Sequence, residues 1–411
     1  MRIAGPGRFQ LGCSAASQSP WNISTLEPIS IFCGWLIQSG LCRIESAPND
    51  ANCRLRYGAI SFPRQTTRCS LSPTIWRRTI AVALPGLRHM VGAPRLSIVM
   101  PTMRRRAELA QALAALEDQT LPRGDYELIL AEDALADAGG PRPEGAGVTV
   151  VRGAIPGASA ARNAGWRAAR APVVLFVDDD IRAPRDLAQR HLAAHGRGAN
   201  AVLGHVRWAP ELKVTPFMHW VDRGVQFDWR TIAGEGPRWW HFYTANASVA
   251  RPLLEAVGGF DEDELPFLYE DLDLARRMSD HGLSLVYDEG AVCDHLVPVT
   301  VESFEARLPR LAASEWAFTR RWPEADAYFR DLFARFAGGP PASGRGRRLI
   351  RFVPRSLPRV GHYVWNSADA HYCGRLGPAF LAEWQRLEDR GDARVVAGGG
   401  VGAGGLEAAG A

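Results

Sequence analysis

Residues 173–181 read Val-Val-Leu-Phe-Val-Asp-Asp-Asp-Ile, five apolar side chains followed directly by three carboxylates. The apolar run predicts a strand that is buried on both faces. Three carboxylates at the end of such a strand cannot all stay ionised without a compensating cation, and oxygen ligands favour Mg²⁺ or Mn²⁺. Because ligands of open α/β sheets bind beyond the carboxyl ends of strands, Asp178, Asp179 and Asp180 are candidates for a metal–phosphate site. The alternative is an acidic start to the next helix.

The chain around this stretch alternates short apolar strands with helical patterns. Strands are predicted at 96–100, 126–130, 148–151 and 173–177, and helices at 107–119, 159–170 and 184–195. We expect Pro101 to stop the first strand. This alternation predicts an α/β fold with a mainly parallel central sheet flanked by helices. Right-handed crossovers would bring Pro101, Thr102, Glu132, Asp133 and the three aspartates to one edge of that sheet.

The pattern changes beyond residue 200. Strands are predicted at 201–206, 244–250 and 283–287, and a helix at 252–257. The intervening irregular segment is rich in aromatic residues, among them Trp208, Trp220, Phe227, Trp229, Trp239, Trp240, Phe242 and Tyr243. Such side chains either stack on sugar rings or other flat ligands, or fill a core or a lid. Glu270 and Asp271 fall at the start of a further helix, where the helix dipole stabilises anions.

Composition changes along the chain suggest its organisation. Residues 1–89 show no sustained strand or helix period and hold five of the seven Cys. We expect a poorly ordered N-terminal extension there, with Met90 as the natural start, and a small disulfide-bearing module is the alternative. A main domain is expected at 90–300 and a helical extension at 301–337. A basic linker with short helices should follow at 338–397, with its last helix at 378–390, and then a disordered Gly/Ala-rich tail at 398–411.

Charge, hydropathy and cysteine content exclude several classes of protein. The net charge is +4, of which residues 1–89 carry +7, so the remaining −3 does not fit a strongly basic nucleic-acid binder. No apolar run is long enough to span a bilayer. Cys293 and Cys373 alone in the main body fit a reducing, cytoplasmic compartment. Residues 345–359 contain six Arg and no acid among apolar residues, which indicates either peripheral contact with the inner face of an anionic membrane or a solvated linker.

Five motifs follow one another over residues 95–297. They are Leu-Ser-Ile-Val-Met-Pro-Thr, Leu-Ile-Leu-Ala-Glu-Asp, Gly-Ala-Ser-Ala-Ala-Arg-Asn-Ala-Gly, Leu-Phe-Val-Asp-Asp-Asp, and Gly-Gly-Phe-Asp-Glu with Tyr-Glu-Asp-Leu-Asp-Leu. This ordered set resembles the family-2 glycosyltransferases, which have the GT-A fold. The resemblance implies a GT-A domain with a helical C-terminal extension. It also implies metal-dependent, inverting transfer of a sugar from a UDP-, GDP- or dTDP-sugar to a glycan, lipid-linked or small-molecule acceptor, in bacterial polysaccharide, glycolipid or other glycoconjugate synthesis.

The resemblance also implies roles for residues that bind the nucleotide. Pro101 and Thr102 match the nucleotide loop after the first strand. Asp133 matches the acid that hydrogen-bonds the base, but Glu132 replaces the usual Asp beside it, so either of the two could make that contact. Arg162 matches the Arg of the Ala-Arg-Asn helix, which lies near the nucleotide.

The remaining matched residues concern the metal and the chemistry. Asp178 and Asp180, which flank Asp179 in the donor site, match the Asp-x-Asp signature, the first directed towards the ribose and the last towards Mg²⁺ or Mn²⁺. Asp271 matches the catalytic base. His295 resembles a later residue that also binds the metal in some members, and a purely structural His is the alternative.

Elementary chemistry agrees with this interpretation. A divalent ion can neutralise a departing diphosphate, and an inverting displacement needs a single carboxylate base within reach of the acceptor hydroxyl. Two rival functions are a sugar nucleotidyltransferase, which normally has a Gly-rich basic loop after its first strand, and a non-catalytic carbohydrate-binding protein on the same fold.

Overall fold

The computed structural model describes residues 42–45, 54–57, 93–103, 108–136, 147–222, 225–265, 267–337, 346–354, 357 and 359–391. The chain divides into two compact units, Met1–Gly92 and Ala93–Ala411. In the first unit, β1 (Cys42–Glu45) and β2 (Arg54–Tyr57) form an antiparallel pair. The rest of the expected extension at 1–89 lies outside the described residues, as do residues 338–345 and the tail at 398–411.

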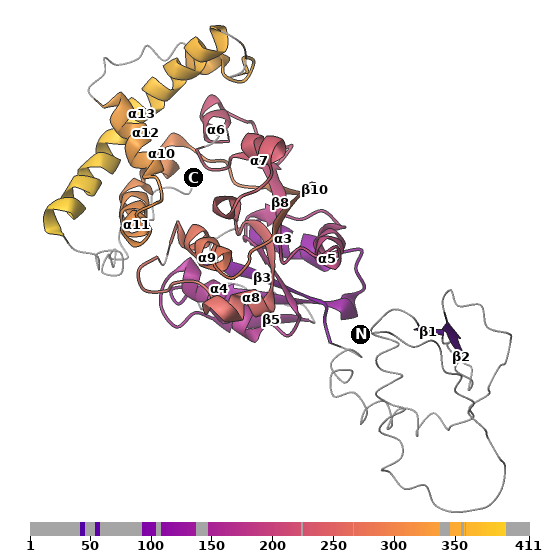
Figure 1. Cartoon of the computed structure of the whole chain (residues 1–411). Helices are drawn as coiled ribbons and strands as arrows, with labels where there is room; N and C mark the ends of the chain where they lie inside the picture. Colours follow the sequence, from indigo (N-terminus) through magenta and orange to yellow (C-terminus); the bar gives the residue numbers. More distant parts are fainter. Residues whose placement is uncertain are drawn as a thin grey trace, which may run out of the picture. The chain divides into compact units, whose positions relative to one another are not determined.

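The second unit is built on an eight-stranded mixed sheet (Figure 1). Its strand order is β5 (Val148–Arg152), β4 (Tyr126–Glu132), β3 (Leu96–Thr102), β6 (Val173–Val177), β9 (Asn246–Ala250), β8 (Ala201–Trp208), β10 (Leu285–His295) and β7 (Ile181–Arg182). β9 and β7 run antiparallel to the strands beside them, and the other six share one direction. The predicted α/β architecture is confirmed, and β6 has the predicted bounds with all five residues buried.

The prediction that Pro101 stops the first strand is wrong. β3 continues through Pro101 to Thr102, and both residues remain paired with β4. The pairing of β3 with β6 on its other side ends at Val99 and Phe176. Pro101 therefore sits where the strand has a neighbour on one side only, so the N–H that proline lacks is not needed by a second ladder.

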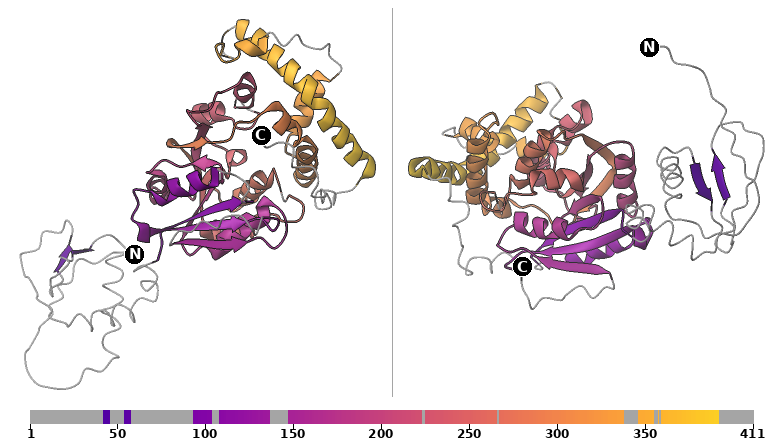
Figure 2. Two further views of the ribbon diagram at one scale, coloured as in Figure 1. Left: turned by 180° about the vertical axis from the view of Figure 1, so that it is seen from behind. Right: turned by 60° about the horizontal axis from the view of Figure 1, so that its bottom comes forward.

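Helices cover both faces of the sheet (Figure 2). α3 (Glu108–Glu117) and α5 (Leu187–Gly196) pack on the face that receives Leu96, Ile98 and Met100 of β3. α4 (Ala158–Ala168), α8 (Arg251–Val257) and α9 (Glu270–Ser279) pack on the opposite face, which receives Val99 and Phe176. The alternation of side chains along a strand therefore assigns each helix to its layer.

The Ala-Arg-Asn-Ala-Gly motif lies on α4, and its Arg162, Asn163 and Gly165 each have a different structural role. The Asn163 side chain donates to Phe260 O at 2.9 Å and accepts from Phe260 N at 2.9 Å, which pins the turn before α9. A Cβ on Gly165 would lie 2.3 Å from Val99 Cγ1, so only glycine allows α4 to approach β3 this closely. Arg162 lies on the same helix and points into the site described below.

The shared direction of the strands brings distant residues to one edge of the sheet. β6 and β10 both end at this edge, and the antiparallel β9 begins there. The aspartates after β6, His295 at the end of β10 and the residues before β9 consequently meet, although more than 100 residues separate the first from the second. The chain adds β4 and β5 on one side of β3 and then returns to place β6 on the other side. The position between β3 and β6 is therefore a topological switch point, at which α/β sheets bind ligands.

The aromatic segment between β8 and β9 is folded rather than irregular. It forms α6 (Pro216–Val221), α7 (Trp229–Glu235) and the 3₁₀ helix η4 (Trp239–His241). Thr215 caps α6 by accepting from Met218 N at 3.2 Å, and Asp228 caps α7 by accepting from Thr231 N at 3.4 Å. Thr and Asp are residue types that favour helix N-caps, but these two helices are too short for an apolar repeat to predict them.

The C-terminal part is helical, as expected, but its last helix is longer than predicted. α10 (Val301–Glu305), α11 (Leu308–Arg321), α12 (Tyr328–Phe336), the 3₁₀ helix η5 (Gly346–Leu349) and α13 (Val360–Arg390) form it. α13 has 31 residues and continues through Pro378, whereas we expected short helices within 338–397 and the last at 378–390. Packing against α12, including Phe380 on Phe333 at 5.2 Å between ring centroids, offsets a proline cost of about 3 kcal/mol.

Two sequence-based expectations concern the environment of the chain. Among the described residues, no helix combines the length and the apolar character needed to cross a bilayer. Cys293 and Cys373 are free, buried thiols, and burial raises the pKa of both.

Candidate active site

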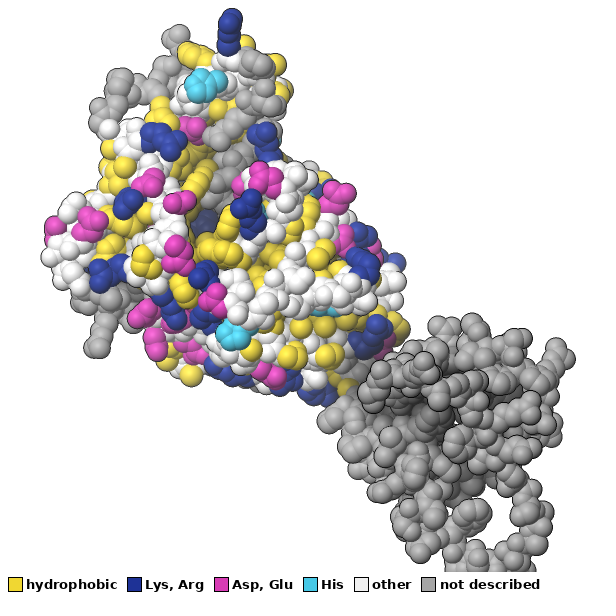
Figure 3. Space-filling view, viewed as in Figure 1, with side chains coloured by type: hydrophobic (Ala, Val, Ile, Leu, Met, Phe, Trp, Pro, Cys, Tyr) yellow, Lys and Arg dark blue, Asp and Glu magenta, His cyan; other side chains and the backbone are white. Residues whose placement is uncertain are grey.

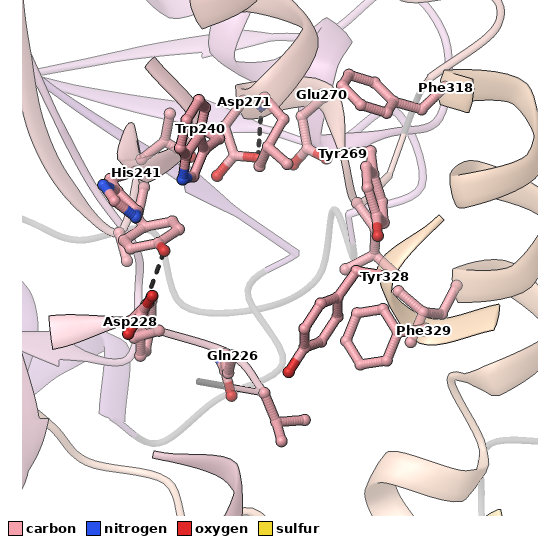
Figure 4. A pocket seen from close by; sticks show the side chains of 18 of the residues that line it. Gln226, Asp228, Trp240, His241, Tyr269, Glu270, Asp271, Phe318, Tyr328 and Phe329 are labelled. Atoms are coloured by element: carbon pink, nitrogen blue, oxygen red, sulfur yellow. Dashed lines mark hydrogen bonds between the residues drawn. The ribbon is translucent and has the colours of Figure 1, made fainter. Parts of the chain in front are cut away.

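A cavity of about 730 Å³ lies at the edge of the sheet where β6 and β10 end, and the C-terminal helices close its other side. Five of the ten predicted site residues line it: Arg162, Asp178, Asp180, Asp271 and His295. The other five, Pro101, Thr102, Glu132, Asp133 and Asp179, do not line this cavity. Figure 4 shows the part of the cavity between Asp271 and the α12 residues Tyr328 and Phe329.

Thr102 and Asp179 meet at the switch point between β3 and β6. The Thr102 hydroxyl donates to Asp179 Oδ2 at 2.6 Å, which joins the two strands where their own pairing has ended. Asp133 accepts from Leu135 N and from Gly157 N, both at 2.8 Å, and so fixes the chain just before α4. Glu132 accepts from Arg152 Nη2 at 2.8 Å. These hydrogen bonds fix the ends of β3 and β4 beside the residues that line the cavity.

Arg162 joins the aspartate motif to the start of α9. Its side chain is buried and donates to Asp178 Oδ1 at 2.9 Å and to Glu270 Oε1 at 2.8 Å. Burial by itself would lower the pKa of Arg162, but Asp178 and Glu270 outweigh it and raise that pKa further. The guanidinium is therefore a permanent cation in the cavity wall. The sequence motifs did not indicate that Glu270 is its partner.

Asp271 is the second residue of α9, and part of its side chain faces the cavity (Figure 4). Burial, reinforced by the charge of Glu270, raises its pKa to about 7, against the opposing effects of Arg162 and of the backbone N–H groups of Thr244 and Leu272. Burial likewise raises the pKa of Glu270. A carboxylate that titrates near neutral pH is suited to accept a proton from a hydroxyl.

The backbone before Asp271 is strained. Leu268 has φ 58° and Tyr269 has φ 60°, left-handed values that cost non-glycine residues about 1–3 kcal/mol each. Side chains of α11 hold this loop: Ser314 donates to Phe267 O at 2.7 Å, and Glu315 accepts from the Tyr269 hydroxyl at 2.5 Å. The strained loop determines where α9 begins and thus where Asp271 lies.

Glu315 is a site-supporting residue that sequence reasoning missed. It is fully buried, and besides Tyr269 it accepts from Phe329 N at 2.7 Å and Arg330 N at 2.9 Å at the start of α12. In the sequence, only the presence of a charged residue among the apolar residues of a helix, next to Trp316, points to this supporting role. Its partners lie on two other elements, which the pattern could not show.

We expect Glu315→Gln to lower the free energy of unfolding by about 2–3 kcal/mol. Both carboxylate oxygens of Glu315 accept hydrogen bonds, and the NH₂ group of Gln would face a donor in place of one of them. Urea denaturation measures this change. The matched control Glu302→Gln removes an exposed partner of Arg375 and should unfold at the parent's urea midpoint. A Glu315→Gln protein as stable as this control would contradict the assigned role.

Asp180 and His295 are the candidate metal ligands. Asp180 Oδ2 and His295 Nε2 lie 3.7 Å apart, because Ile181 pairs with His295 and Leu296 N donates to Asp180 O at 2.8 Å. Within the part of the chain that the structure describes, no three His, Cys, Asp or Glu side chains converge to hold a metal. A carboxylate and an imidazole can supply two ligands, and substrate phosphates and water commonly complete the coordination of Mg²⁺.

The aromatic residues of the segment between β8 and β9 divide between the two expected roles. Trp220 and Phe242 are fully buried in the core. Phe227, Trp239, Trp240 and Tyr243 line the cavity, and the Trp240 side chain is 38% exposed. Trp208 and Trp229 are partly buried away from it. Burial was decided by the tertiary packing and not by residue type.

Comparisons with known proteins agree with this architecture. Residues 97–251 match the family described as Glycosyl transferase family 2. The chain is 27% identical over 249 residues to validoxylamine A glucosyltransferase of Streptomyces hygroscopicus subsp. jinggangensis (strain 5008), covering 49% of this chain and 55% of that protein. It is 23% identical over 259 residues to the probable glycosyltransferase YdaM of Bacillus subtilis (strain 168), covering 58% and 57%. The chain spans little more than half the length of these curated relatives.

Solved structures give a weaker match. The mannosyltransferase PcManGT from Pyrobaculum calidifontis, in complex with GDP-Man and Mn²⁺, has a TM-score of 0.42 at 18% identity, over 73% of this chain and 76% of that one. TarS 1-349 of S. aureus in complex with UDP has a TM-score of 0.38 at 13% identity, over 72% and 92%.

The mixed sheet, with acidic residues at the end of β6 and the start of α9, defines an α/β transferase domain of the GT-A type. Residues 97–251 carry the match to glycosyl transferase family 2. The family match runs from β3 to β9 and ends before Asp271 and His295.

Proposed function

We propose that this protein is a metal-dependent, inverting glycosyltransferase that moves a sugar from a nucleotide-sugar donor to an acceptor hydroxyl. The observation that carries the proposal is that one cavity is lined both by the Asp180–His295 pair and by Asp271. These residues would lie in unrelated places if the acids merely capped helices.

In the proposed reaction, Asp180 and His295 would hold Mg²⁺ or Mn²⁺, and a bound ion would supply positive charge for the diphosphate leaving group. Arg162, whose charge is permanent, faces the same leaving group and keeps Asp178 in place. Asp271 accepts the proton of the acceptor hydroxyl on the opposite side of the anomeric carbon. The acceptor oxygen forms its bond to the anomeric carbon as the bond to the diphosphate breaks on the opposite side, and this single displacement inverts the configuration.

We place the nucleotide beside the cavity, at the ends of β3 and β4. Pro101 and Thr102 lie at the end of β3, and Thr102 donates a hydrogen bond to Asp179 across the switch point. Either Glu132 or Asp133 contacts the base, and Asp178 contacts the ribose. One relative is named a glucosyltransferase. A UDP-, GDP- or dTDP-sugar donor and a glycan, lipid-linked or small-molecule acceptor are the classes to test.

The decisive experiment is a thermal-shift panel of UDP-glucose, UDP-N-acetylglucosamine, GDP-mannose and dTDP-glucose, each with and without Mn²⁺. At a ligand concentration about 100 times Kd, binding adds about 2.7 kcal/mol, and we expect one donor to do this only with Mn²⁺. Release of a nucleoside diphosphate on transfer would complete the assignment. Release of pyrophosphate, or glycan binding without any nucleotide-sugar binding, would overturn it.

We also propose that the region around the start of α13 contacts an anionic membrane surface at its cytoplasmic face. Five of the eleven large hydrophobic side chains that are exposed in the described part of the chain lie here: Leu349, Phe352, Leu357, Val360 and Tyr363. Arg348, Arg351 and Arg359 lie among them, and no acid occurs between Asp331 and Asp369. Figure 3 shows apolar and basic side chains together at this end of the molecule.

We expect the protein to sediment with phosphatidylglycerol vesicles at low salt and to be released at high salt, because charges within a Debye length of the surface attract it. Phosphatidylcholine vesicles should not bind it. The double variant Phe352→Glu/Tyr363→Glu should lose binding, and Leu135→Glu, at an exposed residue elsewhere, should keep it. Equal binding of both variants would refute this contact.

A further inference from the structure

His241, the last residue of η4, lines the cavity next to Trp240. Its side chain is 1% exposed. Nδ1 accepts a hydrogen bond from the backbone N–H of Arg238 at 3.0 Å, which closes the single turn of η4. Since Nδ1 is the acceptor, the proton of the neutral ring must be on Nε2. Burial lowers the pKa of His241, which favours this neutral form.

The Nε2–H group of His241 has no acceptor among the described residues, although it is buried. An unsatisfied buried donor costs about 1–3 kcal/mol, so this group in a cavity wall needs an acceptor from outside the chain, such as a ligand oxygen or a water molecule. The ring is held by the Arg238 contact and by its packing near Trp240 and Tyr243, at 5.6 and 6.2 Å between centroids. The donor is therefore fixed in position before any substrate binds.

The surroundings of His241 suit a sugar ring. Trp240, 38% exposed at the cavity, offers an apolar surface, and apolar ring faces with a few fixed polar groups are typical of carbohydrate and other small-molecule sites. η4 contacts α9, and the backbone N–H of Thr244, three residues after His241, bonds Asp271. Figure 4 shows Trp240 and His241 on the Asp271 side of the cavity, with Tyr328 and Phe329 across from them.

We propose that His241 donates a hydrogen bond from Nε2–H to a hydroxyl of a sugar that lies against Trp240, beside Asp271. The inference rests on the proposed glycosyltransferase function and adds a residue that determines which sugar is accepted. The hydroxyl belongs either to the transferred sugar or to the acceptor, and the experiment separates these sources.

Three substitutions separate substrate binding from support of η4. In His241→Asn the amide oxygen can replace Nδ1 and keep the Arg238 contact, but nothing reaches the position of Nε2. In His241→Gln the amide N–H reaches the position of Nε2, and the contact at Nδ1 is lost. His241→Phe removes both. Thermal denaturation without ligand reports on η4, and binding and kinetics report on the substrate contact.

The probes are the nucleotide sugar that gives the largest shift in the panel above and its free nucleoside diphosphate, measured by calorimetry. If the hydroxyl is on the transferred sugar, His241→Phe and His241→Asn weaken nucleotide-sugar binding about tenfold and leave nucleoside diphosphate binding unchanged. If it is on the acceptor, both affinities and donor hydrolysis stay unchanged, and the acceptor KM rises about tenfold. In the first case His241→Gln should retain more of the parent's nucleotide-sugar affinity than His241→Asn, and in the second case its acceptor KM should rise less.

The proposal is overturned if His241→Asn behaves like the parent protein in both binding and acceptor KM, because the effect of His241→Phe would then come from the lost cap. It is also overturned if all three variants match the parent. A parent protein that binds no nucleotide sugar would instead refute the proposed function, so the two failures are distinguishable.

Discussion

Asp271→Asn is expected to lower the rate of sugar transfer by about 10³-fold while leaving nucleotide-sugar affinity unchanged. General base catalysis contributes about 10²–10⁴-fold, and an amide cannot accept the proton of the acceptor hydroxyl. The substitution is nearly isosteric, so the strained loop before α9 and the cavity shape should persist. Steady-state kinetics with calorimetry of donor binding measures both effects.

The matched control is Asp280→Asn at the other end of α9, where the carboxylate is exposed and pairs with Arg276. It should transfer sugar at the parent rate. If Asp271→Asn retained full activity, Asp271 would have no part in the reaction. If it lost donor binding as well, the residue would support the nucleotide site and not the chemistry.

The pH dependence of the same group gives a second readout. Because the pKa of Asp271 is about 7, kcat/KM of the parent protein should fall as the pH drops below 7 and the base becomes protonated. The raised pKa means that the folded protein binds this proton more tightly than the unfolded chain. The stabilisation of the fold by this bound proton is fully present below the ordinary aspartate pKa of 3.8 and is lost as the pH rises through 7. Asp271→Asn should therefore melt higher than the parent at pH 8, by on the order of 5 °C, and this advantage should shrink at pH 5.

Asp180→Ala is expected to remove most of the metal-dependent affinity for nucleotides, by about 10²-fold, and to lower kcat/KM at least as much. Asp180 and His295 are the two protein groups proposed to hold the ion, so removing the carboxylate leaves one ligand. Calorimetry of UDP and GDP with Mn²⁺ or with EDTA measures the effect. EDTA treatment of the parent protein should reproduce the variant.

Asp186→Ala is the control for Asp180→Ala, because Asp186 lies in the same acidic stretch of sequence but is half-exposed and pairs with Arg190. It should keep its response to Mn²⁺. An Asp180→Ala protein with an undiminished Mn²⁺-dependent affinity would remove Asp180 from the metal site and leave its pairing with His295 as a structural contact.

The candidate site was predictable where its residues follow strands. Buried parallel strands are short apolar runs, so the apolar pattern located their ends and assigned the acids after β6 to the ligand-binding edge. Asp180 follows β6 and His295 ends β10, so their meeting agrees with that logic, whereas Arg162 lies on α4 and was a candidate only through the family resemblance. Glu270, Glu315 and His241 could not be assigned in this way. Glu270 and Glu315 depend on partners 108 and 46 residues away, and His241 depends on the absence of an acceptor, neither of which local patterns encode.

By itself, the sequence determined that the chain is an α/β protein with strands near 96, 126, 148 and 173, and that acidic groups follow them, because burial of a strand requires a continuous apolar run. Only the tertiary structure decided that β9 runs antiparallel, that the strand of Pro101 continues to Thr102, and that α13 passes through Pro378. It also decided which aromatic residues face the cavity. The physical reason is that backbone pairing and side-chain burial between distant segments can outweigh local preferences of a few kcal/mol.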